Sequence, residues 1–313
     1  MLRLDEDWVW DSWVADDGAA YHLFFLKAPR ALRDAVLRHE NARIGHAVSK
    51  DLVEWTVLPD ALTRSDLGWD DLALWTGSTV RGDDGVWRLF YTALSTRGHH
   101  LRDQRIGIAE SKDLVDWRRV SETPAVEPDG RHYKTLEENP RASDTWRDPF
   151  VFRMDDGWHM FITARVLGRP THADGVLAHA TSPDQVQWSV GGPVTTPAGF
   201  GHLEVPQVRC VDGTWVLVFT CHPQEQTPQQ IARFGPHSTW SLNAESPLGP
   251  WDLGRARPFT DEPALFAAPL VQMRDVTWAL IGFRNLEPDG IPSYEILDPI
   301  PVRLAGDHLE AAR

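Results

Sequence analysis

The chain has few cysteines and no long apolar run. Only two of its 313 residues are cysteine, Cys210 and Cys221, which is too few for a disulfide framework. They lie at unequal distances from the turn at residues 212 and 213, so we expect free, buried thiols. No apolar stretch approaches the ~18 residues of a membrane span, and residues 1–26 lack a basic segment followed by an apolar one. The sequence therefore predicts neither a membrane helix nor a signal peptide, and a cytoplasmic location.

Positive charge is also scarce. The chain has 31 Lys and Arg against 45 Asp and Glu, a formal net charge of −14. Such a surface repels phosphate backbones and anionic lipid, so nucleic acid and membranes are not expected as partners, and a neutral or cationic small molecule is favoured. Histidines such as His99 and His100 lack the spacing of metal ligands. We expect no metal and no cofactor.

Helical periodicity is nearly absent, apart from a short stretch at Arg30 to His39. With 42% apolar residues the chain can bury a large core, and 313 residues are ordinary for one closed all-β domain. Pro and charged residues are concentrated at 121–145, which predicts a long loop. We therefore expect a single all-β domain covering residues 1–313.

A short polar run that ends in tryptophan recurs along the chain. In three copies the serine and the tryptophan are six residues apart, and the fourth copy is one residue shorter. The copies are Ser49 to Trp55, Ser111 to Trp117, Ser182 to Trp188 and Ser246 to Trp251. They recur every 62 to 71 residues, and such a period is typical of a repeat architecture. Because they recur at equivalent places in four units, these tryptophans should pack between units.

A hairpin pattern precedes each run, and a fifth copy stands near the C-terminal end. Each has an apolar strand, a turn that is mostly Asp-Gly, and a second strand rich in aromatic and β-branched residues, at 11–26, 76–94, 147–165, 204–222 and 268–285. A further strand pair follows each hairpin, in the last unit around Tyr294 to Leu304. Four antiparallel strands in each of five units predict a five-bladed β-propeller whose first strands line the central axis.

Three acidic residues occupy predicted first strands: Asp11, Asp148 and Glu204. A single carboxylate in a strand is usually solvated or salt-bridged. Three at matching blade positions, each flanked by apolar or aromatic residues, should instead meet at one mouth of the axial channel. Converging carboxylates in a partly dry pocket repel one another, so one of them is pushed to hold a proton. A protonated acid beside an ionised carboxylate is what glycosidic bond cleavage requires.

These segments resemble the five-bladed propeller enzymes of glycoside hydrolase families 32 and 68. YHLFFL at 21–26 and GHAVSKDLVEWTVLPDAL at 45–62 are similar to the invertase and levanase pattern, and TGSTV at 76–80 to their FSGSA-like strand. RDP at 147–149 resembles their Arg-Asp-Pro motif, and EVPQ at 204–207 stands in the place of their Glu-Cys-Pro motif. The resemblance runs in register through four blades.

The chain also departs from both families. Trp10-Asp11-Ser12-Trp13 is closer to the levansucrases of family 68 than to the Asn-Asp-Pro-Asn-Gly of family 32, whereas His202 stands where levansucrases have an additional Glu. The resemblance places His222 at an acceptor-binding position. We expect no C-terminal β-sandwich of the family 32 kind, because the sequence ends near the last predicted strand.

The resemblance implies a role for each carboxylate. Asp11 would be the nucleophile, Glu204 the general acid and base, and Asp148 the carboxylate that stabilises the charge developing on the sugar ring. Six further side chains are candidates for substrate binding: Trp10, Trp13, Trp75, Ser78, Arg147 and His222. For each of them a purely structural role, in core packing, blade bracing or a backbone hydrogen bond, stays open.

The function that follows is a retaining hydrolase or fructosyltransferase acting on β-fructofuranosides such as sucrose or small fructans. Two alternatives stay open. One is an inverting furanosidase of the family 43 type, resembling an arabinofuranosidase, and the other is a propeller that binds sugars without catalysis. Retaining enzymes hold their two carboxyl groups about 5–5.5 Å apart, and inverting ones roughly 6.5–9.5 Å, to admit a water molecule.

Overall fold

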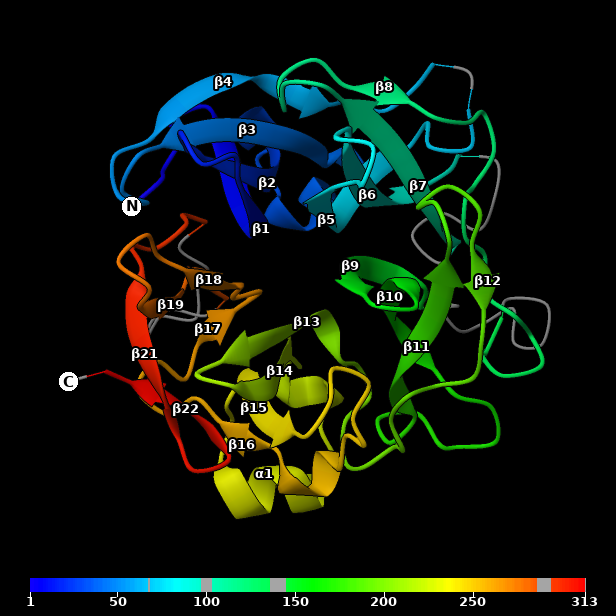
Figure 1. Ribbon diagram of the computed structural model, residues 1–313, viewed down its shortest axis with the longest axis vertical. Helices are drawn as coiled ribbons and strands as arrows, with labels where there is room; N and C mark the ends of the chain where they lie inside the picture. Colours follow the sequence, from blue (N-terminus) through cyan, green and yellow to red (C-terminus); the bar gives the residue numbers. More distant parts are fainter. Residues whose placement is uncertain (67, 97–102, 136–144, 286–293, 313) are drawn as a thin grey trace.

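Five four-stranded antiparallel sheets stand around one axis in the computed structural model, which describes residues 1–66, 68–96, 103–135, 145–285 and 294–312 (Figure 1). The predicted five-bladed β-propeller is confirmed. Among the described residues no helix has the length and apolar character needed to cross a lipid bilayer.

The first strand of each blade lies nearest the axis and the fourth lies at the rim (Figure 1). Blade 1 consists of β1 (Asp7–Asp16), β2 (Tyr21–Pro29), β3 (Arg43–Ser49) and β4 (Thr56–Leu62). Blade 2 consists of β5 (Ala73–Arg81), β6 (Trp87–Leu94), β7 (Gln104–Ser111) and β8 (Arg118–Arg119). Blade 3 consists of β9 (Arg147–Met154), β10 (Gly157–Arg165), β11 (Gly175–Ser182) and β12 (Ser189–Val190).

The last two blades have the same four-stranded form. Blade 4 consists of β13 (Glu204–Val211), β14 (Thr214–Thr220), β15 (Thr239–Ala244) and β16 (Arg257–Pro258). Blade 5 consists of β18 (Leu270–Gln272), β19 (Trp278–Leu280), β21 (Ile300–Ala305) and β22 (His308–Ala311). A two-stranded sheet, β17 (Leu265–Phe266) with β20 (Phe283–Arg284), lies beside blade 5. Within the described residues the helices are η1 (Arg30–Leu32), η2 (Ala35–Asn41), η4 (Pro223–Glu225), α1 (Pro228–Phe234) and η5 (Leu253–Arg255).

The second strands form the core between blades. Every residue of β2 except Pro29 is buried, as is every residue of β10 except Gly157. A strand that is covered on both faces needs apolar residues on both, which explains why these segments read as nearly continuous apolar runs rather than alternating ones. The blades therefore hold one another in place through their faces.

Two of the four recurring tryptophans pack against a ring of the preceding blade, as predicted. The ring of Trp117 in blade 2 meets Phe24 of blade 1 edge to face at 5.7 Å, and Trp188 in blade 3 meets Phe90 of blade 2 at 5.6 Å. Both indole N–H groups donate to a backbone oxygen of their own turn. These rings link neighbouring blades and lie far from the axis.

The serine of each run shapes the turn between the third and fourth strands. Ser111 Oγ accepts a hydrogen bond from Asp113 N. The Asp113 carboxylate in turn accepts from the backbone N–H groups of Val115 and Asp116. Leu114 between them has φ of 66° and its side chain is buried. The fourth copy has Pro247 and Leu248 after Ser246 and lacks the aspartate, so its turn takes another form.

Four details differ from the sequence-based expectations. Blade 5 ends with β22, beyond the predicted Tyr294 to Leu304. The segment at Arg30 to His39 forms two 3₁₀ helices, and α1 was not predicted, because seven residues with a Pro start give too short a periodic signal. Cys210 is exposed, contrary to expectation, whereas Cys221 is buried; both are free.

The predicted loop at 121–145 contains no described strand or helix, and its residues 136–144 lie outside the described part.

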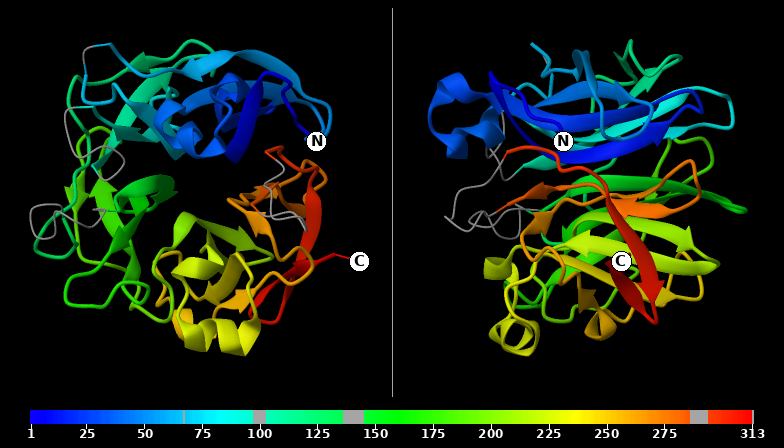
Figure 2. Two further views of the ribbon diagram at one scale, coloured as in Figure 1. Left: turned by 180° about the vertical axis from the view of Figure 1, so that it is seen from behind. Right: turned by 90° about the vertical axis from the view of Figure 1, so that its left-hand side faces the viewer.

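The two ends of the propeller are joined by backbone pairing. Leu2 and Ile296 exchange two hydrogen bonds, Leu2 N to Ile296 O at 2.8 Å and Ile296 N to Leu2 O at 2.9 Å. Both side chains are buried. Figure 2 shows the first residues (blue) lying against the last blade (red). The segment that starts blade 1 therefore closes the ring on blade 5.

The packing of Trp117 gives a stability prediction. Trp117→Ala should lower the free energy of unfolding by about 2–3 kcal/mol, because it removes the contact with Phe24 and leaves a cavity between blades. Urea unfolding followed by circular dichroism measures this. Val115→Ala in the same turn is the control, and should change the value by less than about 0.5 kcal/mol, since Val115 is exposed. Equal effects of the two substitutions would show that Trp117 does not link the blades.

Candidate active site

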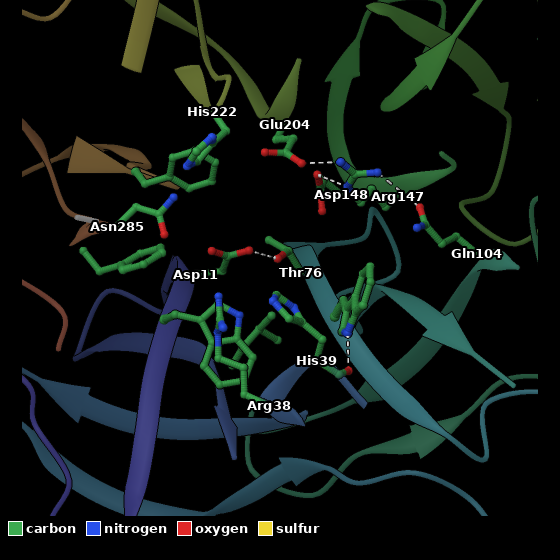
Figure 3. A pocket seen from close by; sticks show the side chains of 15 residues that line it. Asp11, Arg38, His39, Thr76, Gln104, Arg147, Asp148, Glu204, His222 and Asn285 are labelled. Carbon is green, nitrogen blue, oxygen red and sulfur yellow. Dashed lines mark hydrogen bonds and ion pairs between the residues drawn. The ribbon is translucent and has the colours of Figure 1, made fainter. Parts of the chain in front are cut away.

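A pocket of about 360 Å³ opens at one mouth of the axial channel (Figure 3). The first strands of four blades line it, together with η2 and the segment around the small sheet β17–β20. The lining residues are Trp10, Asp11, Leu26, Arg38, His39, Trp75, Thr76, Gln104, Arg147, Asp148, Glu204, His222, Phe266, Phe283 and Asn285. The structure therefore brings the three predicted carboxylates together in one place.

A β-bulge interrupts each of these four first strands at the same level. In β1 the register with β2 shifts between Trp10 and Ser12, and in β9 the strand is irregular around Asp148. Asp11 has φ of 20° and Asp148 has φ of 58°, which is uncommon for residues other than glycine. A bulge turns a side chain out of the regular alternation. In this propeller it turns the carboxylates toward the axis.

The bulge in blade 2 presents a hydroxyl instead of an acid. Thr76 Oγ1 donates to Asp11 Oδ2 at 2.6 Å, which holds the carboxylate in one orientation. The next residue must be glycine, because a Cβ on Gly77 would lie 1.8 Å from the carbonyl oxygen of Phe90. Burial, and to a smaller extent the charge of Glu204, raise the pKa of Asp11 to about 6. The hydrogen bond from Thr76 acts in the opposite direction.

Asp148 is held by blades 3 and 4 together. Its Oδ2 accepts from Thr163 Oγ1 at 3.1 Å and from Val205 N at 3.2 Å, and lies 3.6 Å from Arg147 Nε. The side chain is 5% exposed. Burial raises the pKa of Asp148 to about 7, although the neighbouring guanidinium of Arg147 lowers it, because Glu204 and Asp11 add to the effect of burial.

Glu204 is paired with Arg147 and His202. Arg147 Nη2 donates to Glu204 Oε1, and His202 Nδ1 lies 3.4 Å from the same oxygen. Burial alone would raise the pKa of Glu204, but the charge of Arg147 and the hydrogen bond with His202 outweigh it and hold this pKa well below its usual range. Burial and the charge of Arg147 also lower the pKa of His202, so its ring is neutral near pH 7.

The three carboxylates of the pocket thus differ in their affinity for a proton. Near neutral pH Glu204 is ionised, whereas Asp11 and Asp148 titrate close to neutrality. Three carboxylates facing one volume behave as a coupled set, so the bond that Arg147 makes decides which of them carries a proton. The arrangement can supply a nucleophilic carboxylate, a proton donor and a charge-stabilising group to one bound molecule.

Four of the six predicted substrate-binding residues line the pocket: Trp10, Trp75, Arg147 and His222. His222 Nδ1 accepts from Gln224 N at 3.2 Å. In a neutral imidazole this places the proton on Nε2, which is then free to donate. His222 thus lines the pocket, and its Nδ1 also has the structural role that the sequence left open, a hydrogen bond with the backbone.

Trp13 and Ser78 lie outside this pocket, contrary to prediction. Trp13 is buried against Phe24 and donates from Nε1 to Thr79 Oγ1, and Ser78 Oγ accepts from Val151 N. Each of them comes two positions after a bulge in its strand. Because a strand advances about 3.3 Å per residue, both lie further along the channel, toward its other mouth.

Several pocket residues were not predicted. Arg38 and His39 come from η2, an insertion between β2 and β3, and Arg38 stacks on the rings of Trp10 and Tyr294. Burial lowers the pKa of His39 to about 4, and the charge of Arg38 adds to this. Thr76 could have been found, because it aligns with Asp11 in the blade repeat. Arg38 and His39 stand outside the repeat, which gave no signal for them.

The chain resembles curated fructoside-cleaving enzymes in sequence. It is 27% identical over 205 residues to a cell-wall β-fructofuranosidase of Pisum sativum, covering 62% of this chain and 34% of the relative. It is 31% identical over 173 residues to a sucrose-6-phosphate hydrolase of Zymomonas mobilis, covering 54% and 30%. The matches thus span about a third of the length of these relatives.

Solved structures share the fold over nearly the whole chain. An inulosucrase of Halalkalicoccus jeotgali bound to kestose superposes with a TM-score of 0.77 at 20% identity, covering 99% of this chain and 90% of that one. A family 32 β-fructofuranosidase of Bombyx mori gives 0.74 at 19% identity, covering 100% and 64%.

The family itself is shown by a sequence match over most of the chain. The family model described as the glycosyl hydrolases family 32 N-terminal domain matches residues 13–255. This range extends from β1 through the 3₁₀ helix η5 of blade 4, and it includes Asp148 and Glu204. The chain belongs to glycosyl hydrolase family 32.

Proposed function

We propose that the protein cleaves β-fructofuranosides with retention of configuration at the anomeric carbon. The observation that carries the proposal is the convergence of Asp11 and Glu204 from opposite sides of one pocket, with Asp148 beside them (Figure 3). The family assignment and the fructoside-cleaving relatives support the same reaction. Sucrose and small fructans are the proposed substrates, and residues 1–313 the single catalytic domain.

In the first step an Asp11 oxygen attacks the anomeric carbon of the fructosyl group. The bond to the leaving oxygen breaks, and Glu204 gives that oxygen its proton. In the second step Glu204 takes a proton from water or from an acceptor hydroxyl, whose oxygen replaces Asp11 on the anomeric carbon. Thr76 keeps the attacking carboxylate in place through its hydrogen bond to Oδ2.

Asp148 stabilises the charged transition state. Its Oδ2 is already engaged by Thr163 and Val205 N, so the carboxylate is fixed before substrate arrives. A carboxylate held in this way accepts hydrogen bonds from ring hydroxyls that strengthen as positive charge develops on the sugar. Trp10, Trp75 and His222 bound the volume in which the two sugar rings would sit.

The first step requires a redistribution of protons on substrate binding. Glu204 is ionised as long as Arg147 is bonded to it. Hydroxyls of the substrate compete for Arg147 Nη2 and exclude water, which raises the affinity of Glu204 for a proton. Asp11 and Asp148, which titrate near neutrality, are within reach as the source of that proton.

Product analysis tests the proposed reaction. Sucrose, inulin-type and levan-type oligosaccharides and arabinofuranosides are incubated with the protein in the presence of methanol. A retaining enzyme forms the methyl β-fructofuranoside from fructosides, because methanol intercepts the Asp11 ester from the side that the leaving group left. Release of arabinose alone, or a product of inverted configuration, would favour the family 43 type of reaction, and no turnover at all would favour a sugar-binding propeller.

Substitution of the two catalytic carboxylates should give different kinetic signatures. Asp11→Asn and Glu204→Gln are each expected to reduce kcat for sucrose by at least about 1000-fold. For Glu204→Gln alone, a fructoside with a good leaving group should recover much of the rate of the first step, since such a group needs no proton. Asp212→Asn, in the turn between β13 and β14, is the control and should keep full activity.

Asp148 should lower the stability of the folded protein above neutral pH. Its folded pKa of about 7 exceeds the unfolded value of about 3.9, so the folded state binds more protons between these values and stability falls as pH rises through this window. Asp148→Asn should therefore raise Tm at pH 8 by about 2–4 °C and change it little at pH 4. Activity should fall.

The control has the opposite sign. Backbone hydrogen bonds from Asp116 and Val115 lower the pKa of Asp113, so this residue stabilises the fold above its unfolded pKa. Asp113→Asn should lower Tm at pH 8. If Asp148→Asn also lowers Tm at pH 8, the proposed strain of that buried carboxylate is absent. Differential scanning calorimetry at the two pH values provides the measurement.

A further inference from the structure

A second pocket, of about 310 Å³, lies at the other end of the axial channel. The first strands of all five blades line it beyond their bulges, and from Glu204 to Arg209 the chain advances about 16 Å along β13. Its walls are of mixed character, and the apolar and aromatic part consists of Trp13, Val14, Tyr21, Val80, Phe150, Pro269, Leu270, Val271 and Trp278. Neither the family assignment nor the proposed reaction uses this pocket.

Arg209 is the charged residue that distinguishes the second pocket. Its guanidinium lies over the ring of Phe150, 5.0 Å from the ring centre. Within the described ranges it forms no hydrogen bond and no ion pair. By contrast the buried guanidinium groups of Arg88, Arg147 and Arg165 each bind a carboxylate. Burial lowers the pKa of Arg209 to about 10, and no neighbouring carboxylate counteracts this, so the group stays charged at pH 7.

Three other polar side chains of the pocket can also donate hydrogen bonds. Gln207 Oε1 is occupied by Leu270 N at 3.0 Å, which leaves its NH₂ group to donate. Ser78 Oγ accepts from Val151 N and Thr79 Oγ1 from Trp13 Nε1, which leaves the two hydroxyl hydrogens. The carboxylate of Asp16 at the rim already accepts from Arg274 at 3.0 Å. Gln207, Ser78 and Thr79 thus each have a donor for a molecule that enters the pocket.

Several hydrogen-bond donors beside an unpaired guanidinium suit an anion. Arginine binds a carboxylate through two parallel N–H···O bonds, and the single positive charge matches one negative charge better than the two of a phosphate. The apolar and aromatic walls suit a hydrophobic body. The volume is at the lower end of the range for small-molecule sites, about 300–1,000 Å³, so the ligand is small.

We propose that the pocket around Arg209 binds a small organic monocarboxylate with an apolar body, at a site separate from the three carboxylates of the active site. Arg209 receives the carboxylate together with Gln207, and Phe150 and Trp278 contact the apolar part. Such a ligand touches the first strands of all five blades, so its binding should stabilise the folded ring.

Thermal unfolding with chosen probes tests the proposal. Benzoate should raise Tm of the full chain by about 2–4 °C at ten times its dissociation constant. Benzamide, which is neutral and of the same shape, should have a much smaller effect, as should inorganic phosphate, which lacks the apolar body. Isothermal titration calorimetry should give one benzoate bound per chain.

Variants locate the site. Arg209→Gln should abolish the benzoate-dependent shift while leaving sucrose turnover unchanged, which also shows that the variant is folded. Arg81→Gln, which removes an arginine that lies over Trp87 at the end of β5, is the matched control and should bind benzoate normally. An equal shift in Arg209→Gln and in the unmodified protein would overturn the proposal, as would equal shifts by benzoate and benzamide.

Discussion

The β-bulge at one level of four neighbouring first strands is the constraint on which the site depends. Without it, strand alternation would turn Asp11 and Asp148 into the packed faces between blades, where an unpaired carboxylate is costly. The bulge requires backbone angles that residues other than glycine rarely adopt. The extensive packing between blades, through buried second strands and the recurring tryptophans, holds the backbone in that conformation.

Arg147 determines which of the three carboxylates is ionised. One guanidinium contacts both Asp148 and Glu204, and so three acids can be buried around one volume without all three holding protons. The cost is visible in the raised pKa values of Asp11 and Asp148. A buried group of this kind trades stability of the folded state for reactivity, which is common at functional sites.

The repeat in the sequence was sufficient to predict the blades and the convergence of Asp11, Asp148 and Glu204, because equivalent positions in a propeller meet at its axis. It could not give the mouth of the channel to which a side chain points: Trp13 and Ser78 stand close to the bulges but face the other end. Arg38 and His39 belong to an insertion that the repeat does not contain. The proton distribution was also beyond sequence, since it depends on which carboxylate Arg147 reaches.

The backbone pairing of Leu2 with Ile296 has a consequence for synthesis of the chain. Ile296 follows Leu2 by 294 residues (296 − 2), so at about 5–20 residues per second the segment around Leu2 waits roughly 15–60 s for its partner. During that time the apolar face of blade 1 that will meet blade 5 has no cover. A nascent chain of this architecture must therefore stay free of aggregation, alone or with a chaperone, until Ile296 has been synthesised.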